Sequence, residues 1–151
     1  MSLILDGILF ELNTESRNTA FFIHNDDGYE FSLDCYFHAN TFMDEEITPY
    51  LCINAIHIGS DNIESIIGKT FEVKNIEEAM RREDTLCIFE HEPLESYKIT
   101  VIEFKNDRAH IKCSGIAVTD GYAKPYKTAK FELDCFLPII TNVNDWKKFG
   151  L

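Results

Sequence analysis

The sequence predicts a mostly β fold of the α+β class: a twisted antiparallel sheet or sandwich with one or two short helices in its middle segment. Apolar and polar residues alternate with a period of two along several segments, which is typical of half-buried strands. Turn-forming residues separate these segments, and the helical signals between them are short. Hydrophobic residues make up 45% of the chain and charged residues 26%, as in globular proteins. At 151 residues the chain is expected to form a single domain, residues 1–151.

The alternation is clearest in segments 29–38 and 131–137. Because successive side chains of a strand point to opposite faces, the apolar set of each segment is expected to face a core. In the first segment this set is Phe31, Leu33, Cys35 and Phe37, and in the second it is Phe131, Leu133, Cys135 and Leu137. Further strands are expected at residues 3–12, 19–24, 50–58, 70–74, 85–90, 97–105 and 109–117, with turns at 25–28, 105–107 and 120–121.

Two short helices are expected between these strands. Asp61 and Glu64 have the spacing of a capping arrangement, and Gly68 is placed to end the helix that they begin. Asn75 and Glu78 repeat the arrangement ahead of a second short helix.

A weak internal repeat suggests that the sheet is pseudo-duplicated. Asp27-Gly28-Tyr29 precedes the strand that carries Cys35, and Asp120-Gly121-Tyr122 precedes the strand that carries Cys135. Both cysteines share a face with large apolar residues, so we interpret them as core residues. Asp34 and Asp134 are then expected on the opposite, solvated face.

The cysteines and the first residues of the chain predict a cytoplasmic protein with reduced thiols. The five cysteines are odd in number and widely spaced. Residues 1–12 lack a basic start, and Asp6 interrupts their apolar run, so they do not have the pattern of a secretory signal.

The charge distribution predicts a basic protein partner. The net charge is −12, which argues against nucleic acid or an anionic membrane as the partner. Residues 39–95 hold thirteen acids and four bases, whereas residues 96–151 are mildly basic. The residues expected to form an acidic binding patch are Asp44, Glu45, Glu46, Glu77, Glu78, Glu83 and Asp84. Aromatic anchors beside such a patch are expected among Tyr36, Tyr122, Tyr126, Phe136 and Trp146, unless a second layer covers them.

No enzyme motif is present. Phosphate-binding glycine loops, a nucleophile elbow and paired zinc-ligand motifs are absent. His110 and Cys113 face opposite sides of their predicted strand, and His91 with Glu92 supplies at most two metal ligands. We therefore expect a non-enzymatic protein with no catalytic residues, no metal site and no cofactor.

A small, acidic, β-rich chain without a catalytic motif resembles the immunity proteins of bacterial contact-dependent inhibition and related polymorphic toxin systems. The resemblance is one of profile, namely size, charge and an Ile/Asn/Lys/Phe-rich composition, and it carries over no functional residue. It implies a cognate toxin domain, often a basic nuclease, that is neutralised by binding over or near its active site.

The sequence hypothesis is thus a non-enzymatic immunity or inhibitor protein that binds a basic partner. Two alternatives stay open. One is a β-barrel or sandwich that binds a small ligand in an aromatic-lined cavity. The other is an acidic DNA mimic that inhibits a nucleic-acid-binding protein.

Overall fold

Twelve strands dominate the computed structural model, which describes residues 1–151. Strands hold 57% of the residues and helices 12%, which confirms the predicted mostly β class. The strands are β1 (Ser2–Leu5), β2 (Ile8–Glu11), β3 (Ala20–Asn25), β4 (Tyr29–Tyr36), β5 (Asn40–Phe42), β6 (Glu45–Ile47), β7 (Tyr50–His57), β8 (Thr70–Val73), β9 (Thr85–Cys87), β10 (Leu94–Lys105), β11 (Arg108–Asp120) and β12 (Lys127–Ile140). The helices are η1 (Ile63–Ile66), α1 (Ile76–Arg82) and η2 (Val143–Phe149).

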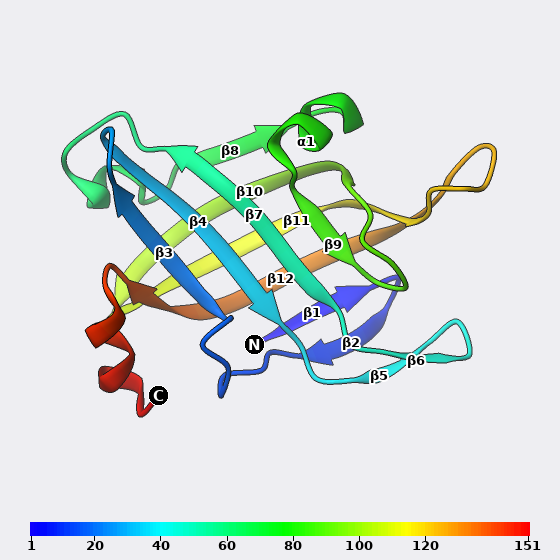
Figure 1. Cartoon of the computed structure of the whole chain (residues 1–151), viewed down its shortest axis with the longest axis horizontal. Helices are drawn as coiled ribbons and strands as arrows, with labels where there is room; N and C mark the ends of the chain where they lie inside the picture. The colour runs from blue at the N-terminus through cyan, green and yellow to red at the C-terminus, as the bar shows by residue number, and fades with distance from the viewer.

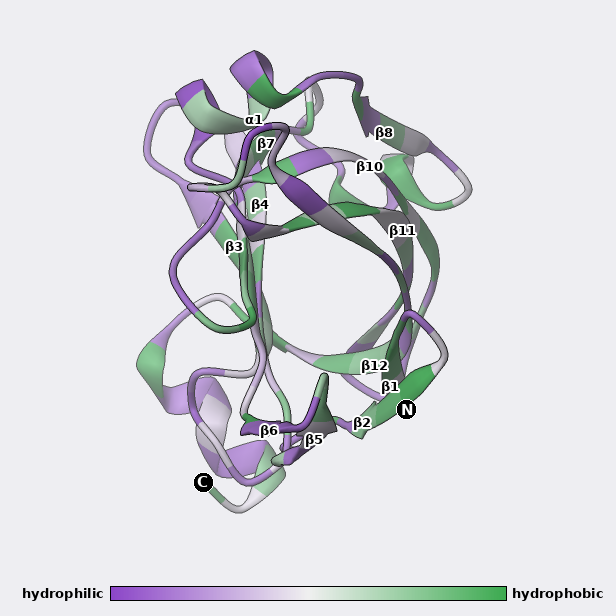
Figure 2. Cartoon of the chain, turned by 90° about the vertical axis from the view of Figure 1, so that its right-hand side faces the viewer, coloured by the Kyte–Doolittle hydropathy of each residue, from purple (hydrophilic) through white to green (hydrophobic).

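Ten strands form one twisted sheet, and β5 and β6 form a separate hairpin. The long strand β12 joins two halves of the large sheet: it pairs with β11 along one edge, and with β1 and then β3 along the other. The two halves, β8-β10-β11-β12 with β1 and β2, and β3-β4-β7-β9, face each other (Figures 1 and 2). A bridge between Leu12 and Phe37 brings the halves together along a second edge.

The pairings between the strands of the sheet are antiparallel, as predicted, except for one, which makes the sheet mixed. β3 runs parallel to the end of β12, where Ile139 and Ile140 pair with Phe21 and Phe22. The alternation of apolar residues could not show this, because it reports which face of a strand is buried and says nothing about the direction of its neighbour.

The core lies between the two halves of the sheet. It is a single cluster of 34 buried residues, to which both halves contribute. Cys35 and Cys135 belong to it, as the alternation predicted, and the ring of Phe21 stacks on that of Phe31 at a centroid distance of 4.9 Å. All five cysteines are unpaired.

The internal repeat corresponds to two hairpins, β3–β4 and β11–β12. Each hairpin delivers one core cysteine, Cys35 or Cys135, from its second strand. The likeness does not extend upstream, because β10 pairs with β11 whereas β2 pairs with β1. Asp134 is exposed, but Asp34 is half-buried, which raises its pKa.

The helices are partly as predicted. The side chain of Asn75 accepts a hydrogen bond from the Glu78 amide and caps α1, which confirms that helix. The other middle helix is a single 3-10 turn, η1, which is capped by Asn62 rather than by Asp61. η2 and the β5–β6 hairpin were not predicted from the sequence. No helix here combines the length and the apolar character that crossing a bilayer requires.

Gly115 marks a close approach between β10 and β11. A Cβ atom there would lie 2.8 Å from the Cα atom of Tyr97 and would also collide with the backbone oxygen of Ser96. We expect Gly115→Ala to lower the free energy of unfolding by about 3 kcal/mol, because backbone rather than a mobile side chain must give way. Urea unfolding measures this. Gly7→Ala is a useful comparison, since open space surrounds Gly7, and its smaller loss would reflect only the backbone strain of a left-handed turn. Equal losses for the two variants would contradict the steric explanation.

The side chain of Asp145 stabilises the N-terminus of η2 through hydrogen bonds. Its Oδ2 accepts hydrogen bonds from the Thr141 hydroxyl at 2.7 Å and from the amides of Thr141 and Asn142 at 2.8 and 3.1 Å. These bonds, that of the hydroxyl first, hold the pKa of Asp145 well below its ordinary value of 3.8. A carboxyl group whose pKa is lower in the folded state than in the unfolded state stabilises the fold. This stabilisation is fully present when the pH is above the unfolded-state pKa, and it is lost as the pH falls through the folded-state pKa.

We therefore expect Asp145→Asn to lower the free energy of unfolding by about 1 kcal/mol at pH 7. The gap between variant and wild type should narrow steadily as the pH falls below the ordinary pKa. Urea unfolding across that pH range tests this. If the free energies of unfolding of variant and wild type stayed equally far apart at every pH, the ionised Asp145 carboxylate would not be the source of the stabilisation.

Candidate functional site

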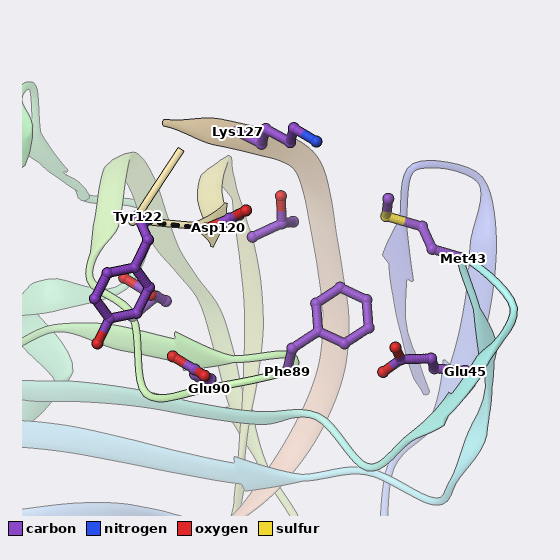
Figure 3. A pocket seen from close by; sticks show the side chains of 9 residues that line it. Met43, Glu45, Phe89, Glu90, Asp120, Tyr122 and Lys127 are labelled. Atoms are coloured by element: carbon purple, nitrogen blue, oxygen red, sulfur yellow. Dashed lines mark hydrogen bonds between the residues drawn. The ribbon is translucent and has the colours of Figure 1, made fainter. Parts of the chain in front are cut away.

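One end of the molecule carries a groove lined mostly by acidic and aromatic side chains. It lies between the β5–β6 hairpin, the segment that follows β9 and the loop that joins β11 to β12 (Figure 3). Its volume is about 540 Å³. Its lining residues, which we call the acidic groove, are Met43, Glu45, Phe89, Glu90, Glu92, Thr119, Asp120, Tyr122 and Lys127. Four carboxylates thus meet at this groove with a single lysine.

The four groove carboxylates are not neutralised by nearby bases. Neither Glu45, Glu90, Glu92 nor Asp120 takes part in any of the ion pairs of the structure. Lys127 lines the same groove without forming an ion pair there. Four carboxylates beside a single lysine leave the groove with a net negative charge, and the resulting negative potential attracts a basic partner.

The loop between β11 and β12 places an aromatic side chain beside these charges. Asp120 Oδ1 accepts hydrogen bonds from the amides of Tyr122 and Ala123 at 3.0 and 3.2 Å and so fixes the turn. Tyr122 follows with 83% of its surface exposed, and its ring stands at the groove (Figure 3). An exposed tyrosine can pack on a partner and also hydrogen-bond to it, which is why tyrosine is common at interface hot spots.

Gly121 allows Glu92 to reach this loop. The Gly121 amide donates a hydrogen bond to Glu92 Oε1 at 3.3 Å. A Cβ atom at position 121 would lie 2.5 Å from Glu92 Oε2, so any larger residue would displace that carboxylate. The glycine therefore sets the position of one groove carboxylate.

The β5–β6 hairpin forms the opposite wall. Its turn residues, Met43 and Asp44, have φ angles of 50° and 63°, as a tight two-residue hairpin turn requires. Phe42 is buried, with its ring 5.9 Å from that of Phe89, and this packing anchors the hairpin beside the segment that follows β9. As a result, Glu45 lines the groove and Met43 stays exposed at its rim.

Further acidic residues gather around Tyr126, in the same loop. The Tyr126 hydroxyl donates a hydrogen bond to Glu95 Oε1 at 2.8 Å. This bond raises the pKa of Tyr126, and the nearby carboxylate of Glu77 raises it further. Glu77 therefore lies near this loop and extends the acidic surface toward α1.

The structure places the seven predicted patch residues in different surroundings. Glu45 lines the groove, and Asp44 and Glu46 are exposed on the same hairpin. In or beside α1, Glu77 and Glu83 are exposed and Glu78 is half-buried. Glu90, Glu92 and Asp120 were not predicted as site residues, because nothing local in the sequence shows that their loops meet.

Asp84 is the exception, and its assignment to an exposed patch was wrong. It is fully buried. Its Oδ2 accepts hydrogen bonds from the Tyr97 hydroxyl at 2.6 Å and from Arg82 Nε at 2.7 Å, and its Oδ1 accepts one from the Asn54 amide at 2.8 Å. Asp84 therefore ties the end of α1 to β7 and β10 and is not available to a partner.

The predicted aromatic anchors also differ in their exposure to solvent. Trp146, a residue of η2, is only 5% exposed and packs edge-on against Phe22. Tyr36 stacks on Tyr50, and Phe136 stacks on His110, both on half-buried outer faces. Among the predicted anchors, Tyr122 is largely exposed, and it lines the acidic groove.

No protein-family model, no curated protein and no solved structure matches this chain.

Proposed function

We propose that this protein is a non-enzymatic inhibitor, of the kind that acts as an immunity protein, and that it binds a basic protein partner at the acidic groove. The observation that carries the proposal is the convergence of four carboxylates that form no ion pair beside an exposed tyrosine. A cognate toxin domain with a basic active site is the partner that this chemistry fits best. A nuclease must attract phosphate, and carboxylates can occupy the same positively charged surface.

The groove combines two properties that a protein interface needs. The charges of Glu45, Glu90, Glu92 and Asp120 speed the encounter with a basic surface and disfavour acidic partners. The exposed side chains of Tyr122 and Met43 add apolar area that is removed from water on binding. Charge would thus supply selectivity and rate, and the aromatic contact would prolong the complex.

The two alternatives have less support. The space between the halves of the sheet is filled by the 34-residue core, which does not favour a ligand in an internal cavity. A DNA mimic would share the acidic surface and differ in its partner, which affinity capture would identify.

Affinity capture tests the proposal. We would immobilise the protein, apply lysate of the source organism at low salt and identify what salt releases. The expected result is one basic protein with a toxin-like domain. Its toxicity on expression should be relieved by co-expression of the wild-type chain, but not by the triple variant Glu45→Gln, Glu90→Gln, Glu92→Gln.

Three results would count against the proposal. Equal protection by the triple variant would show that the groove is not the interface. Capture of a nucleic-acid-binding protein without toxin activity would favour the DNA mimic. An empty column together with thermal stabilisation by small apolar ligands would favour the ligand-binding alternative.

A further inference from the structure

The acidic groove contains a buried hydroxyl group that has no partner in the chain. Thr119, on β11, lines the groove, and only 8% of the residue is exposed. The side-chain hydrogen bonds at this end of the molecule involve other residues, and none involves the Thr119 hydroxyl. The unpartnered hydroxyls that are sealed from solvent are those of Ser65 and Thr85, so the Thr119 oxygen is accessible from the groove. Because buried hydroxyl groups are nearly always hydrogen-bonded, this one indicates a partner that enters from outside the chain.

Two carboxylates beside Thr119 are fixed in position and each keeps one oxygen free. Thr119 and Asp120 are neighbours on β11, and the β-bulge between Val118 and Asp120 lets both line the groove. Asp120 Oδ1 accepts two backbone amides of the loop that follows it, and Glu92 Oε1 accepts the amide of Gly121. Asp120 Oδ2 and Glu92 Oε2 accept no hydrogen bond. The groove thus offers unused acceptors that are already positioned, which lowers the entropic cost of binding a donor.

The charges of the lining favour a ligand that is cationic and rich in hydrogen-bond donors. Carboxylates accept hydrogen bonds and donate none, and the groove has four of them beside Lys127. A guanidinium group carries five N–H donors, no acceptor and a permanent positive charge. It therefore matches a lining in which acceptors outnumber donors.

Two aromatic rings in the groove favour a guanidinium group over an ammonium group. Phe89 and Tyr122 line the groove, and both rings stand along it (Figure 3). Phe89 is half-buried and packs on Phe42, so its position is fixed. The planar guanidinium group stacks on aromatic faces, whereas the compact ammonium group of lysine is more strongly hydrated. An aromatic surface beside carboxylates therefore selects arginine over lysine.

We propose that the acidic groove is a guanidinium-binding site that takes an arginine side chain of the basic partner. The guanidinium group stacks on an aromatic ring of the groove and donates hydrogen bonds to the Thr119 hydroxyl and to the free oxygen of Asp120. The other carboxylates balance its charge. The volume of about 540 Å³ lies within the range of sites that enclose small ligands. The assignment rests on the proposed function, because the basic partner supplies the arginine.

The experiment compares two peptides of equal charge, acetyl-Lys-Gly-Arg-Gly-Lys-amide and acetyl-Lys-Gly-Lys-Gly-Lys-amide. Each is titrated at low salt into the isotope-labelled full chain, and binding is followed by NMR. Because the peptides differ only in the central side chain, the attraction of net charge is the same for both. We expect the arginine peptide to bind about tenfold more tightly and to shift the amide signals of Thr119 and Asp120.

Thr119→Val tests the hydroxyl itself, since valine keeps the shape of the side chain. The variant should bind the arginine peptide about threefold to tenfold more weakly than wild type. Its stability to urea should be nearly unchanged, because the hydroxyl that is lost has no partner in the free protein. Thr128→Val is the matched control: Thr128 is exposed on β12, where it pairs with Val118, and it does not line the groove. This variant should bind the arginine peptide as wild type does.

Equal affinities of the two peptides for the wild type would overturn the proposal, as would an unchanged affinity for the arginine peptide in a folded Thr119→Val variant. The wild-type comparison needs no substitution, so it holds even if a variant fails to fold. The peptide experiment is also separate from the capture experiment. A basic partner that binds through the groove would support the proposed function even if the two peptides bound equally. Conversely, a preference for the arginine peptide would support the guanidinium site even if capture found no basic protein.

Discussion

Replacing Asp84 by alanine is expected to lower the free energy of unfolding by about 3–5 kcal/mol, the range for a buried ion pair that loses one partner. The carboxylate is fully buried and accepts three hydrogen bonds, from Arg82, Tyr97 and the Asn54 amide. Without it, the Tyr97 hydroxyl and the Asn54 amide lose their partner in a region from which water is excluded. The Arg82 guanidinium would keep only its bonds to the carbonyls of Asn54 and Ala55.

Urea unfolding at pH 7 measures this loss, and Glu83→Gln is the matched control. Glu83 is the neighbouring residue, is exposed and forms no ion pair, so its replacement should change stability by less than about 0.5 kcal/mol. Tyr97→Phe removes only one hydroxyl from the same network and should cost about 1–2 kcal/mol. An Asp84→Ala variant as stable as the Glu83→Gln variant would show that the buried network contributes little.

Neutralising the acidic groove is expected to have the largest effect on binding. In the Glu45→Gln, Glu90→Gln, Glu92→Gln variant, the association rate with the captured basic partner should fall about tenfold to a hundredfold at low salt. Glutamine keeps the shape of each side chain, so the change isolates charge. The difference from wild type should shrink as salt is added, because salt screens exposed charges beyond about 10 Å at 0.1 M.

The control removes the same number of charges at a distance from the groove. Asp26, Asp27 and Asp61 are exposed near the β3–β4 turn and near η1, at the opposite end of the molecule from the loop between β11 and β12 (Figure 1). The Asp26→Asn, Asp27→Asn, Asp61→Asn variant should bind nearly as fast as wild type. Stopped-flow fluorescence measures the association rates. An equal decrease of the association rate in both triple variants would assign the effect to net charge and not to the groove.

The strands and the core were predictable because their signal is local. Phe31, Leu33 and Cys35 alternate with polar residues, and in β4 they are all buried. Asn75 could be assigned as the cap of α1 because a cap and the amide that it accepts from are three residues apart. The predicted cap of η1, Asp61, was wrong by one residue, because Asp61 and Asn62 both have side chains that can cap a helix and Asn62 does so in the structure.

The candidate site was only partly predictable because its residues come from three distant segments. The sequence indicated an acidic middle segment and included Glu45, but it ranked Asp84 with Glu83, although one is fully buried and the other exposed. Both are acids at the end of a short helix, and the partners that hold Asp84 inward include Tyr97 on β10 and Asn54 on β7, which are distant in the sequence. Glu90, Glu92 and Asp120 meet because β9, β11 and β12 bring their loops to the same end of the molecule.

By itself, the sequence therefore determined the mostly β class, the inward faces of the main strands, the α1 cap and the excess of negative charge. These depend on spacing along one segment and on composition. Only the tertiary structure decided the mixed pairing of β12 with β3, the burial of Asp84 and Trp146, and the acidic groove. Alternation along a strand fixes which side chains face inward, but the neighbour and register of that strand depend on the packing of the whole chain.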